Sequence, residues 1–205
     1  FKTVIHLMPD LYGSNPDIDK GMFYRVIYDM NLQADDWKIY PTAVTEFTKL
    51  KKLYDLGEYE PYSETNIDLL INLMIEIKPH ISKWTRIERL IRDIPTKSIV
   101  AGYNGKTNLR QVIHNKMKKR GLKCKCLRCM ELRNKDVDIK SAKLVVVSYN
   151  DSFGKEYFIS YETCSCSFIC FSWLYFNIIY FCYKLLTVFN LSDYFNNINK
   201  LQDYK

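Results

Sequence analysis

Three cysteines within six residues constrain this chain more than any other feature. Cys124, Cys126 and Cys129 form a C-x-C-x-x-C cluster with lysine or arginine between the sulfurs. A structural zinc site takes thiolates at about 2.3 Å and needs four ligands in a tetrahedron, so the backbone must turn tightly here. The neighbouring cations favour the thiolate form, which is the form that binds metal. The spacing predicts a structural zinc site, and the alternative is three reduced cysteines without metal.

The cluster lacks a fourth ligand of its own. His114, on the preceding predicted helix, is the nearest candidate, and a cysteine or histidine outside this chain would serve as well. The seven cysteines are odd in number and lie in two groups, at 124–129 and 164–182. That distribution does not suit a disulfide framework and indicates a reducing compartment, so we expect a cytoplasmic protein.

Basic residues are concentrated in one region of the chain. Residues 1–77 carry 7 basic and 13 acidic side chains, whereas residues 78–155 carry 20 basic and 6 acidic ones. A balance of +14 in one span is typical of a surface that contacts phosphates, and the alternative is a solvated face that only maintains solubility. We expect six side chains beside the cysteines to form a strip that contacts RNA: Lys116, Lys118, Lys119, Arg120, Lys123 and Lys125.

Hydrophobic periodicity predicts alternating strands and helices before the cysteines and a hairpin after them. Ser63 is expected to cap one helix, and Thr107 or Asn108 another. Trp84–Asp93 fits a helix or a strand, and its place in the alternation favours a strand. The expected strands are Lys2–Met8, Trp37–Tyr40, Trp84–Asp93, Lys143–Tyr149 and Lys155–Tyr161, and the expected helices are Pro16–Met30, Leu50–Gly57, a third ending at Ile77 and a fourth ending at Arg120.

Five segments occur in an order that resembles a known family. They are HLMPDL at His6–Leu11, KIYPT at Lys38–Thr42, RLIRDIPTKSIVAG at Arg89–Gly102, NLRQVI at Asn108–Ile113 and GLKCKCLRCMELR at Gly121–Arg133. Together they are similar to the catalytic subunit of Elongator, which carboxymethylates the wobble uridine of tRNA. The resemblance runs from His6 to about Glu162. Of the family's site residues, it carries over only Cys124, Cys126 and Cys129.

The resemblance implies an α/β fold in three parts. Residues 1–120 would form the C-terminal part of a radical S-adenosylmethionine (β/α) barrel, 121–136 a cysteine-rich zinc linker, and 137–162 the first strands of a GNAT-like acetyltransferase domain. It also implies tRNA and other Elongator subunits as partners, and a [4Fe-4S] cluster, S-adenosylmethionine and acetyl-CoA as cofactors. Residues 1–120 contain no cysteine, so the cluster's ligands would lie outside this chain, and we expect the chain alone to be inactive.

The last part of the chain, 163–205, departs from the family. Residues Cys164–Tyr183 carry no charge over twenty positions and show neither helical nor strand periodicity. That length suits a membrane anchor, and translated non-coding sequence is the interpretation we prefer. A buried core strand ranks third, because the run is too long for one. From the residues alone, the alternative to an enzyme subunit is a zinc-stabilised RNA-binding module without catalytic activity.

Overall fold

The structure is a computed structural model that describes residues 2–91, 94–103, 108–132, 141–151, 154–163, 168–175 and 178–179. The chain divides into two compact units, Phe1–Met130 and Glu131–Lys205. Each is described by itself below.

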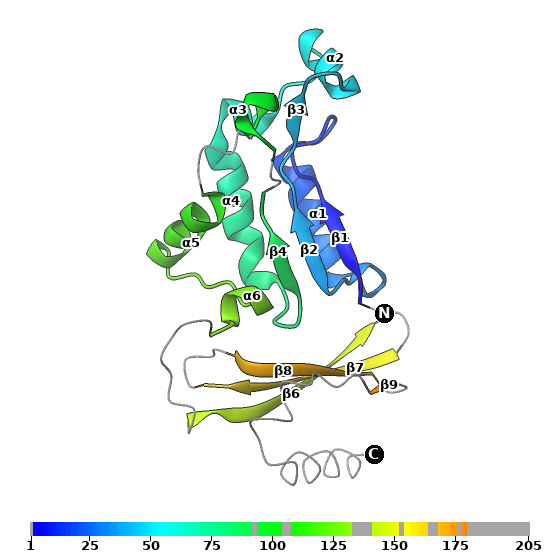
Figure 1. The fold of residues 1–205 in the computed structure, drawn as a ribbon, viewed down its shortest axis with the longest axis vertical. Coiled ribbons are helices and arrows are strands. Elements are labelled where there is room, and N and C mark those ends of the chain that lie inside the picture. The colour runs from blue at the N-terminus through cyan, green and yellow to red at the C-terminus, as the bar shows by residue number, and fades with distance from the viewer. Residues whose placement is uncertain are drawn as a thin grey trace. The chain divides into compact units, whose positions relative to one another are not determined.

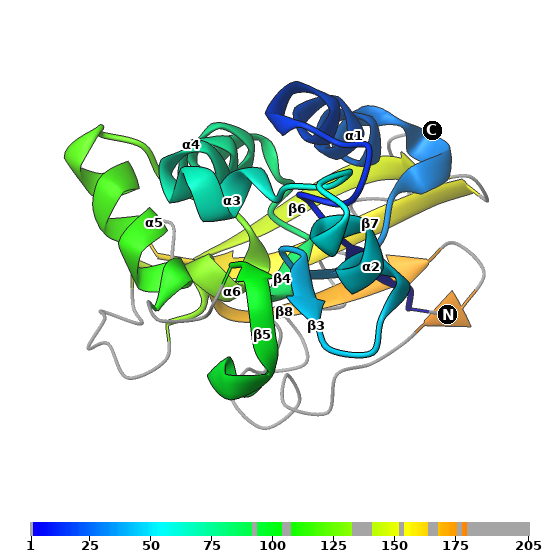
Figure 2. The same ribbon diagram turned by 90° about the horizontal axis from the view of Figure 1, so that it is seen from above.

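A parallel sheet of three strands forms the centre of the first unit. Its order is β1 (Val4–Leu7), β2 (Asp36–Ile39) and β4 (Arg86–Arg89), and both pairings are parallel. Helices α1 (Pro16–Tyr28) and α4 (Ile67–Ile77) lie between these strands in the chain and pack side by side (Figures 1 and 2). Parallel strands need such crossover connections, which is why strand and helix alternate here.

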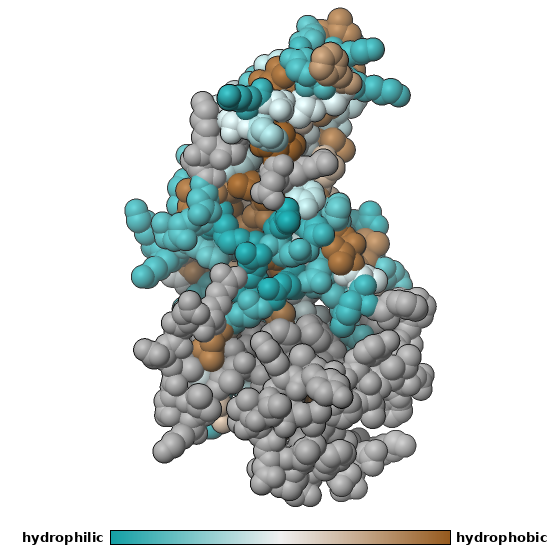
Figure 3. Space-filling model, viewed as in Figure 1, coloured by the Kyte–Doolittle hydropathy of each residue, from teal (hydrophilic) through white to brown (hydrophobic). Residues whose placement is uncertain are grey.

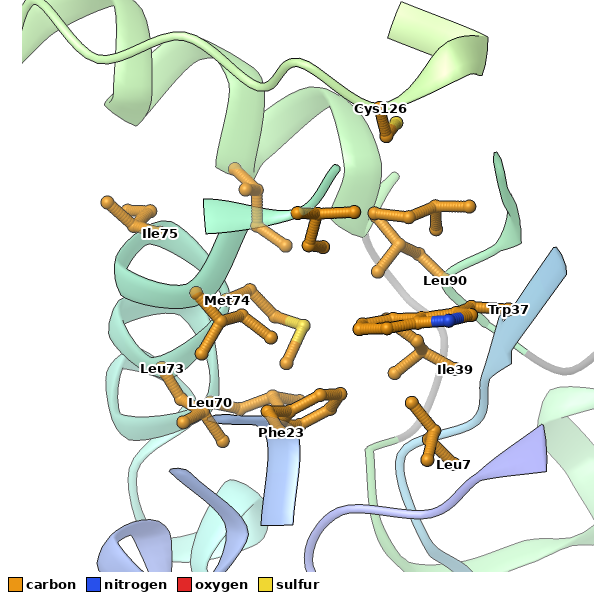
Figure 4. Packing of buried hydrophobic residues seen from close by; sticks show 14 of the residues in the cluster. Leu7, Phe23, Trp37, Ile39, Leu70, Leu73, Met74, Ile75, Leu90 and Cys126 are labelled. Carbon is orange, nitrogen blue, oxygen red and sulfur yellow. The ribbon is translucent and has the colours of Figure 1, made fainter. Parts of the chain in front are cut away.

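The core of the first unit lies between this sheet and its helices. Phe23 of α1 and Met74 of α4 are fully buried, as are Ile39 and Ile87 of the sheet. Trp37 is 2 % exposed, and its ring lies 6.4 Å from that of Phe23, centroid to centroid. Figure 4 shows these side chains meeting in one cluster, with Cys126 at its edge beyond Leu90. Burial of this cluster holds the helices on the sheet.

Asparagine side chains cap the starts of α1 and α4. The Asn15 side chain accepts hydrogen bonds from the backbone of Asp17 and Ile18 at the start of α1. The Asn66 side chain likewise caps α4, so the expectation that Ser63 caps this helix is wrong. Ser63 lies instead inside a separate short helix, α3 (Tyr62–Thr65), because the extended backbone of Asn66 interrupts the helical path.

A small antiparallel ribbon was not expected from the sequence. β3 (Ala43–Thr45) pairs with β5 (Ile99–Gly102), and α2 (Lys49–Asp55) packs against β3. Gly102 has a φ of +86°, and a Cβ there would lie 2.6 Å from the Thr42 carbonyl oxygen. Only glycine allows this close approach of the two strands.

Two further helices lead to the cysteines. α5 (Leu109–Lys119) buries Leu109, Ile113 and Met117 against the core and is followed by Gly121 in the left-handed conformation. Asn108 stands at its N-cap position without a side-chain capping bond, and Thr107 lies outside the described residues. The short helix α6 is Leu127–Met130. Three single turns of 3-10 helix complete the unit: η1 (Met30–Leu32), η2 (Lys78–His80) and η3 (Thr96–Ser98).

The second unit contains an antiparallel sheet in the order β6, β7, β8 and β9. The predicted hairpin is confirmed as β6 (Lys143–Asp151) and β7 (Gly154–Glu162), with Val147 opposite Phe158. The turn residues 152 and 153 lie outside the described residues.

Part of the uncharged segment forms strands of the same sheet. β8 (Phe168–Tyr175) pairs antiparallel with β7, and β9 (Ile178–Ile179) pairs with β8. The sequence showed no strand periodicity here, and a buried strand was the third of the three interpretations of this segment. A strand in the middle of a sheet can be apolar on both faces, so the alternation that marks a half-buried strand need not appear. Within the residues that the structure describes, no helix is long and apolar enough to cross a bilayer. The rest of this segment, beyond residue 179, lies outside the described residues.

Candidate metal centre

The loop between α5 and α6 brings the three cysteine sulfurs together. The Sγ atoms of Cys124, Cys126 and Cys129 all lie within 4.8 Å of one another. The tight turn that this requires is made by α6, where the Cys129 amide donates to the Cys126 carbonyl oxygen at 2.9 Å. The Leu127 amide donates to the Thr85 carbonyl oxygen at 2.9 Å, which fixes the loop beside the start of β4. We call these three residues the cysteine triad.

His114 lies beside the triad, as the sequence suggested. Its Nε2 atom is 3.5 Å from the Cys129 Sγ atom, and His114 itself is half-buried beside Ile113 on α5. Burial lowers the pKa of His114 to about 4, and the charges of Lys78 and Arg110 act in the same direction. The imidazole is therefore neutral at pH 7, which is the form that offers a lone pair to a metal.

The geometry of the triad favours the thiolate form at Cys126. Hydrogen bonds from the thiols of Cys124 and Cys129 lower the pKa of the Cys126 thiol well below its usual value. Cys126 is fully buried, whereas the other two cysteines are partly exposed. A buried thiolate that accepts two hydrogen bonds is poised to bind a cation.

Cationic side chains surround the triad from three elements. Arg110 of α5 donates to the carbonyl oxygens of Ile87 and Glu88 at 3.1 and 3.4 Å, and Arg128 of α6 also donates to that of Glu88. Lys78, where α4 ends and η2 begins, is 0 % exposed. Its charge acts on all three cysteines. Sequence reasoning missed Lys78, because a lysine before Pro79 in a basic region looks like an ordinary surface residue.

The six residues of the expected RNA-contacting strip lie along the end of α5 and the loop after it. Two of them reach back to α4, since Lys116 Nζ lies 2.5 Å from an Asp68 carboxylate oxygen and Arg120 donates to the Asn72 side chain at 2.8 Å. The others are exposed: Lys118, Lys119, Lys123 and Lys125. Figure 3 shows a largely hydrophilic surface around α5.

A second polar cluster lies where β1 ends, and the sequence did not reveal it. The buried Asp10 carboxylate accepts hydrogen bonds from the amides of Tyr62 and Ser63 at 2.8 and 3.0 Å. The Asp19 carboxylate accepts from the Asp10 amide at 2.7 Å and from the Tyr62 hydroxyl at 2.7 Å. The Asp10 carboxylate thus accepts the free amides at the start of α3, although it lies 52 positions before Tyr62 in the sequence.

Comparison with known proteins gives a consistent set of relatives. Residues 34–119 match the family model of the radical SAM C-terminal domain. The tRNA uridine(34) acetyltransferase of Methanocaldococcus jannaschii is 40% identical over 167 residues, which are 78% of this chain and 30% of that protein. Elongator complex protein 3 of Schizosaccharomyces pombe is 32% identical over 166 residues, 79% of this chain and 30% of that protein.

A solved structure agrees with these matches. The archaeal Methanocaldococcus infernus Elp3 with an N-terminal deletion superposes with a TM-score of 0.76 at 36% sequence identity, covering 83% of this chain and 41% of that one. The chain thus spans about a third of the length of the curated relatives that it matches.

Proposed function

We propose that this chain supplies part of an acetyltransferase that modifies the wobble uridine of tRNA. The chain is a homologue of the Elongator catalytic subunit over about four-fifths of its length. The observation that carries the proposal is the agreement between the matched relatives and the solved structure over the same part of the chain. Those relatives are named for tRNA uridine(34) acetylation and for Elongator. Partner subunits of the Elongator type are part of the same proposal.

The first unit is proposed to contribute part of a (β/α) barrel. Its parallel strands β1, β2 and β4 are connected through helices, which is the connectivity of such a barrel. Three strands cannot close a barrel, so further strands would have to pair with the sheet edges. The antiparallel hairpin β6–β7 is proposed as the start of a GNAT-like domain, with residues 121–136 as the linker before it.

The cysteine triad and His114 are proposed to bind one zinc ion. Ligands at about 2.3 Å from a tetrahedral ion lie roughly 3.8 Å apart. The sulfurs within 4.8 Å of one another and the 3.5 Å separation of His114 Nε2 from Cys129 Sγ fit that size. Thiolates that bind separate irons of a cluster would be farther apart. Four protein ligands leave no open position for substrate, so the role would be structural.

The first 120 residues of this chain do not fit the iron–sulfur cluster of the family. Residues 1–120 contain no cysteine that could hold an iron–sulfur cluster at the carboxyl ends of the parallel strands. Ligands for that cluster, for S-adenosylmethionine and for acetyl-CoA are therefore proposed to lie outside this chain. No catalytic residue is assigned here.

Binding of tRNA is proposed for the strip of six basic residues beside the metal centre. The exposed lysines 118, 119, 123 and 125 follow one another from the end of α5 into the loop. Phosphate contacts of this kind give affinity without base specificity. A zinc-stabilised RNA-binding module remains the second candidate function. It is favoured by the cysteine triad and the basic strip, since both lie in a chain whose first 120 residues contain no cysteine.

Metal analysis tests the zinc site. The full chain purified without added metal should contain about one zinc and little iron, and Cys126→Ser and His114→Ala should each reduce the zinc content and weaken metal binding. Cys182→Ser is the matched control, because it removes a cysteine from the second group instead. A folded chain that binds no zinc would overturn the proposed site.

A further inference from the structure

Lys78 is a buried cation without a partner. The side chain is 0 % exposed, and within the described part of the chain no acceptor makes a hydrogen bond with its Nζ atom. An ammonium group taken out of water loses a large hydration energy, and a group in that position either loses its charge or has an opposite charge nearby. The structure shows no carboxylate paired with Lys78 among the described residues.

The negative groups close to Lys78 are the cysteine sulfurs. Lys78 interacts electrostatically with Cys124, Cys126 and Cys129, and with His114 as well. The lysine enters from the end of α4, whereas these four residues come from α5 and the loop that follows. Lys78 and Cys126 are both fully buried, so little solvent screens the interaction between their charges.

We propose that the Lys78 ammonium is the counter-charge of the metal centre and strengthens metal binding through its charge. This inference rests on the proposed zinc site. One Zn²⁺ with three thiolates and a neutral imidazole has a net charge of −1, which is costly to bury. One lysine charge neutralises the centre.

The two arginines near the triad are placed differently. The guanidinium groups of Arg110 and Arg128 each donate to a backbone carbonyl oxygen of β4. Those bonds fix α5 and α6 to the sheet and spread the arginine charges toward the peptide groups. Lys78 makes no such bond with any described residue, so its charge is not spread onto a backbone carbonyl oxygen. Lys78 would therefore act on the metal centre through its charge, and it does not bind the metal itself.

The test compares wild type, Lys78→Met and Lys78→Arg in the full 205-residue chain. Methionine keeps the length and apolar stem of lysine but removes the charge and the donors, whereas arginine keeps both. Zinc affinity would be measured by competition with a colorimetric chelator. The charge-transfer band of the cobalt-substituted protein reports directly on the sulfur ligands. Lys52→Met, on the exposed face of α2, is the control for loss of one lysine charge elsewhere.

We expect Lys78→Met to bind zinc at least tenfold more weakly than wild type and to shift the cobalt charge-transfer band. Lys78→Arg should recover most of the affinity, and Lys52→Met should match wild type. Thermal unfolding with zinc and with chelator provides a second measurement. A purely structural role would lower the unfolding temperature equally in both conditions, whereas a counter-charge makes the zinc-dependent increase smaller in Lys78→Met.

The outcomes separate this inference from the zinc site. If wild type binds zinc and Lys78→Met binds it equally well with an unchanged cobalt spectrum, the role of Lys78 is overturned and the zinc site stands. If wild type binds no metal, both are overturned. If Lys78→Met does not fold, Lys78→Arg tests the role of the charge. An arginine variant that folds but binds zinc much more weakly than wild type contradicts that role.

Discussion

Replacing Asp10 with alanine should detach the start of α3 from the end of β1 and destabilise the first unit. The Asp10 carboxylate is buried and accepts the Tyr62 and Ser63 amides at 2.8 and 3.0 Å. Hydrogen bonds to a charged group contribute about 1.5–3 kcal/mol each, and the carboxylate's own burial offsets part of that sum. We therefore expect the free energy of unfolding to fall by about 3 kcal/mol.

The backbone at Asp10 supplies a matched control. Its φ is 69°, in the left-handed region, where an ordinary residue is less stable by about 1–2 kcal/mol and glycine is not. Asp10→Gly loses the same hydrogen bonds as Asp10→Ala but relieves this strain, at the cost of a more flexible unfolded chain. We expect the stability order wild type, then glycine, then alanine.

The pH dependence gives an independent reading of the same carboxylate. Burial raises the pKa of Asp10 above its usual value, although the hydrogen bonds from Ser63 and Tyr62 act against this. A raised pKa in the folded state means that the folded protein binds the proton more tightly than the unfolded chain. That contribution to stability is complete below the unfolded pKa and is lost as pH rises through the folded pKa. The stability advantage of wild type over Asp10→Asn should therefore grow as pH falls from 7 toward 4.

Urea unfolding followed by circular dichroism, at a fixed zinc concentration, would measure these differences. A loss of about 3 kcal/mol corresponds to roughly 6–12 °C in the unfolding temperature of a protein of this size. A loss below about 1 kcal/mol for Asp10→Ala would refute the reasoning, because bonds of this kind are worth more than that when buried. Alanine and glycine variants of equal stability would refute the strain argument alone.

Three further predictions follow from the core, the basic strip and the missing ligands. Phe23→Ala should destabilise the first unit by about 3–5 kcal/mol in the same urea assay. Phe47→Gly is the control and should not destabilise it, because Phe47 is fully exposed with a φ of 63°. Equal losses of stability in the two variants would contradict the assigned core. In filter binding, the double variant Lys118→Glu/Lys119→Glu should bind different tRNAs about equally weakly and with a flatter salt dependence than wild type. A similar loss of tRNA affinity in Lys49→Glu/Lys52→Glu, on α2, would contradict a localised strip. The chain alone, incubated with tRNA, acetyl-CoA and S-adenosylmethionine without oxygen, should yield no carboxymethyluridine by mass spectrometry; product above a no-protein control would show that the catalytic ligands are present after all.

Long elements could be predicted from the sequence, and short ones could not. The helix Pro16–Tyr28 buries Phe23, Val26 and Ile27 at helical spacing, and β6 and β7 are nine residues long each and rich in β-branched and aromatic residues. The ribbon of β3 and β5 has strands of three and four residues, too short for a pattern. Its register depends on the close approach at Gly102, which is a tertiary contact.

The candidate ligands of the proposed metal centre could be named from the sequence, whereas their surroundings could not. The three cysteines follow from their spacing, and His114 follows from its place on the preceding helix. Lys78 lies 46 positions before Cys124, and local sequence does not reveal whether a lysine is buried at such a distance. The same holds for Asp10 and Tyr62, whose contact depends on the path of the whole first unit. Buried polar partners that are distant in sequence are thus the part that requires a structure.

The order of events during folding can be read from the position of the metal ligands. All four proposed ligands lie between residues 114 and 129, so one ion can close the site within a single short segment. Loops of about ten residues close in roughly 10–100 ns, far sooner than the parallel pairing of β1, β2 and β4 can be completed. The hydrogen bond from Leu127 to Thr85, in contrast, bridges 42 positions and requires β4 to be in place. When the full-length chain refolds with zinc present, we therefore expect the α5–α6 segment to capture its ion first and to dock onto the sheet afterwards.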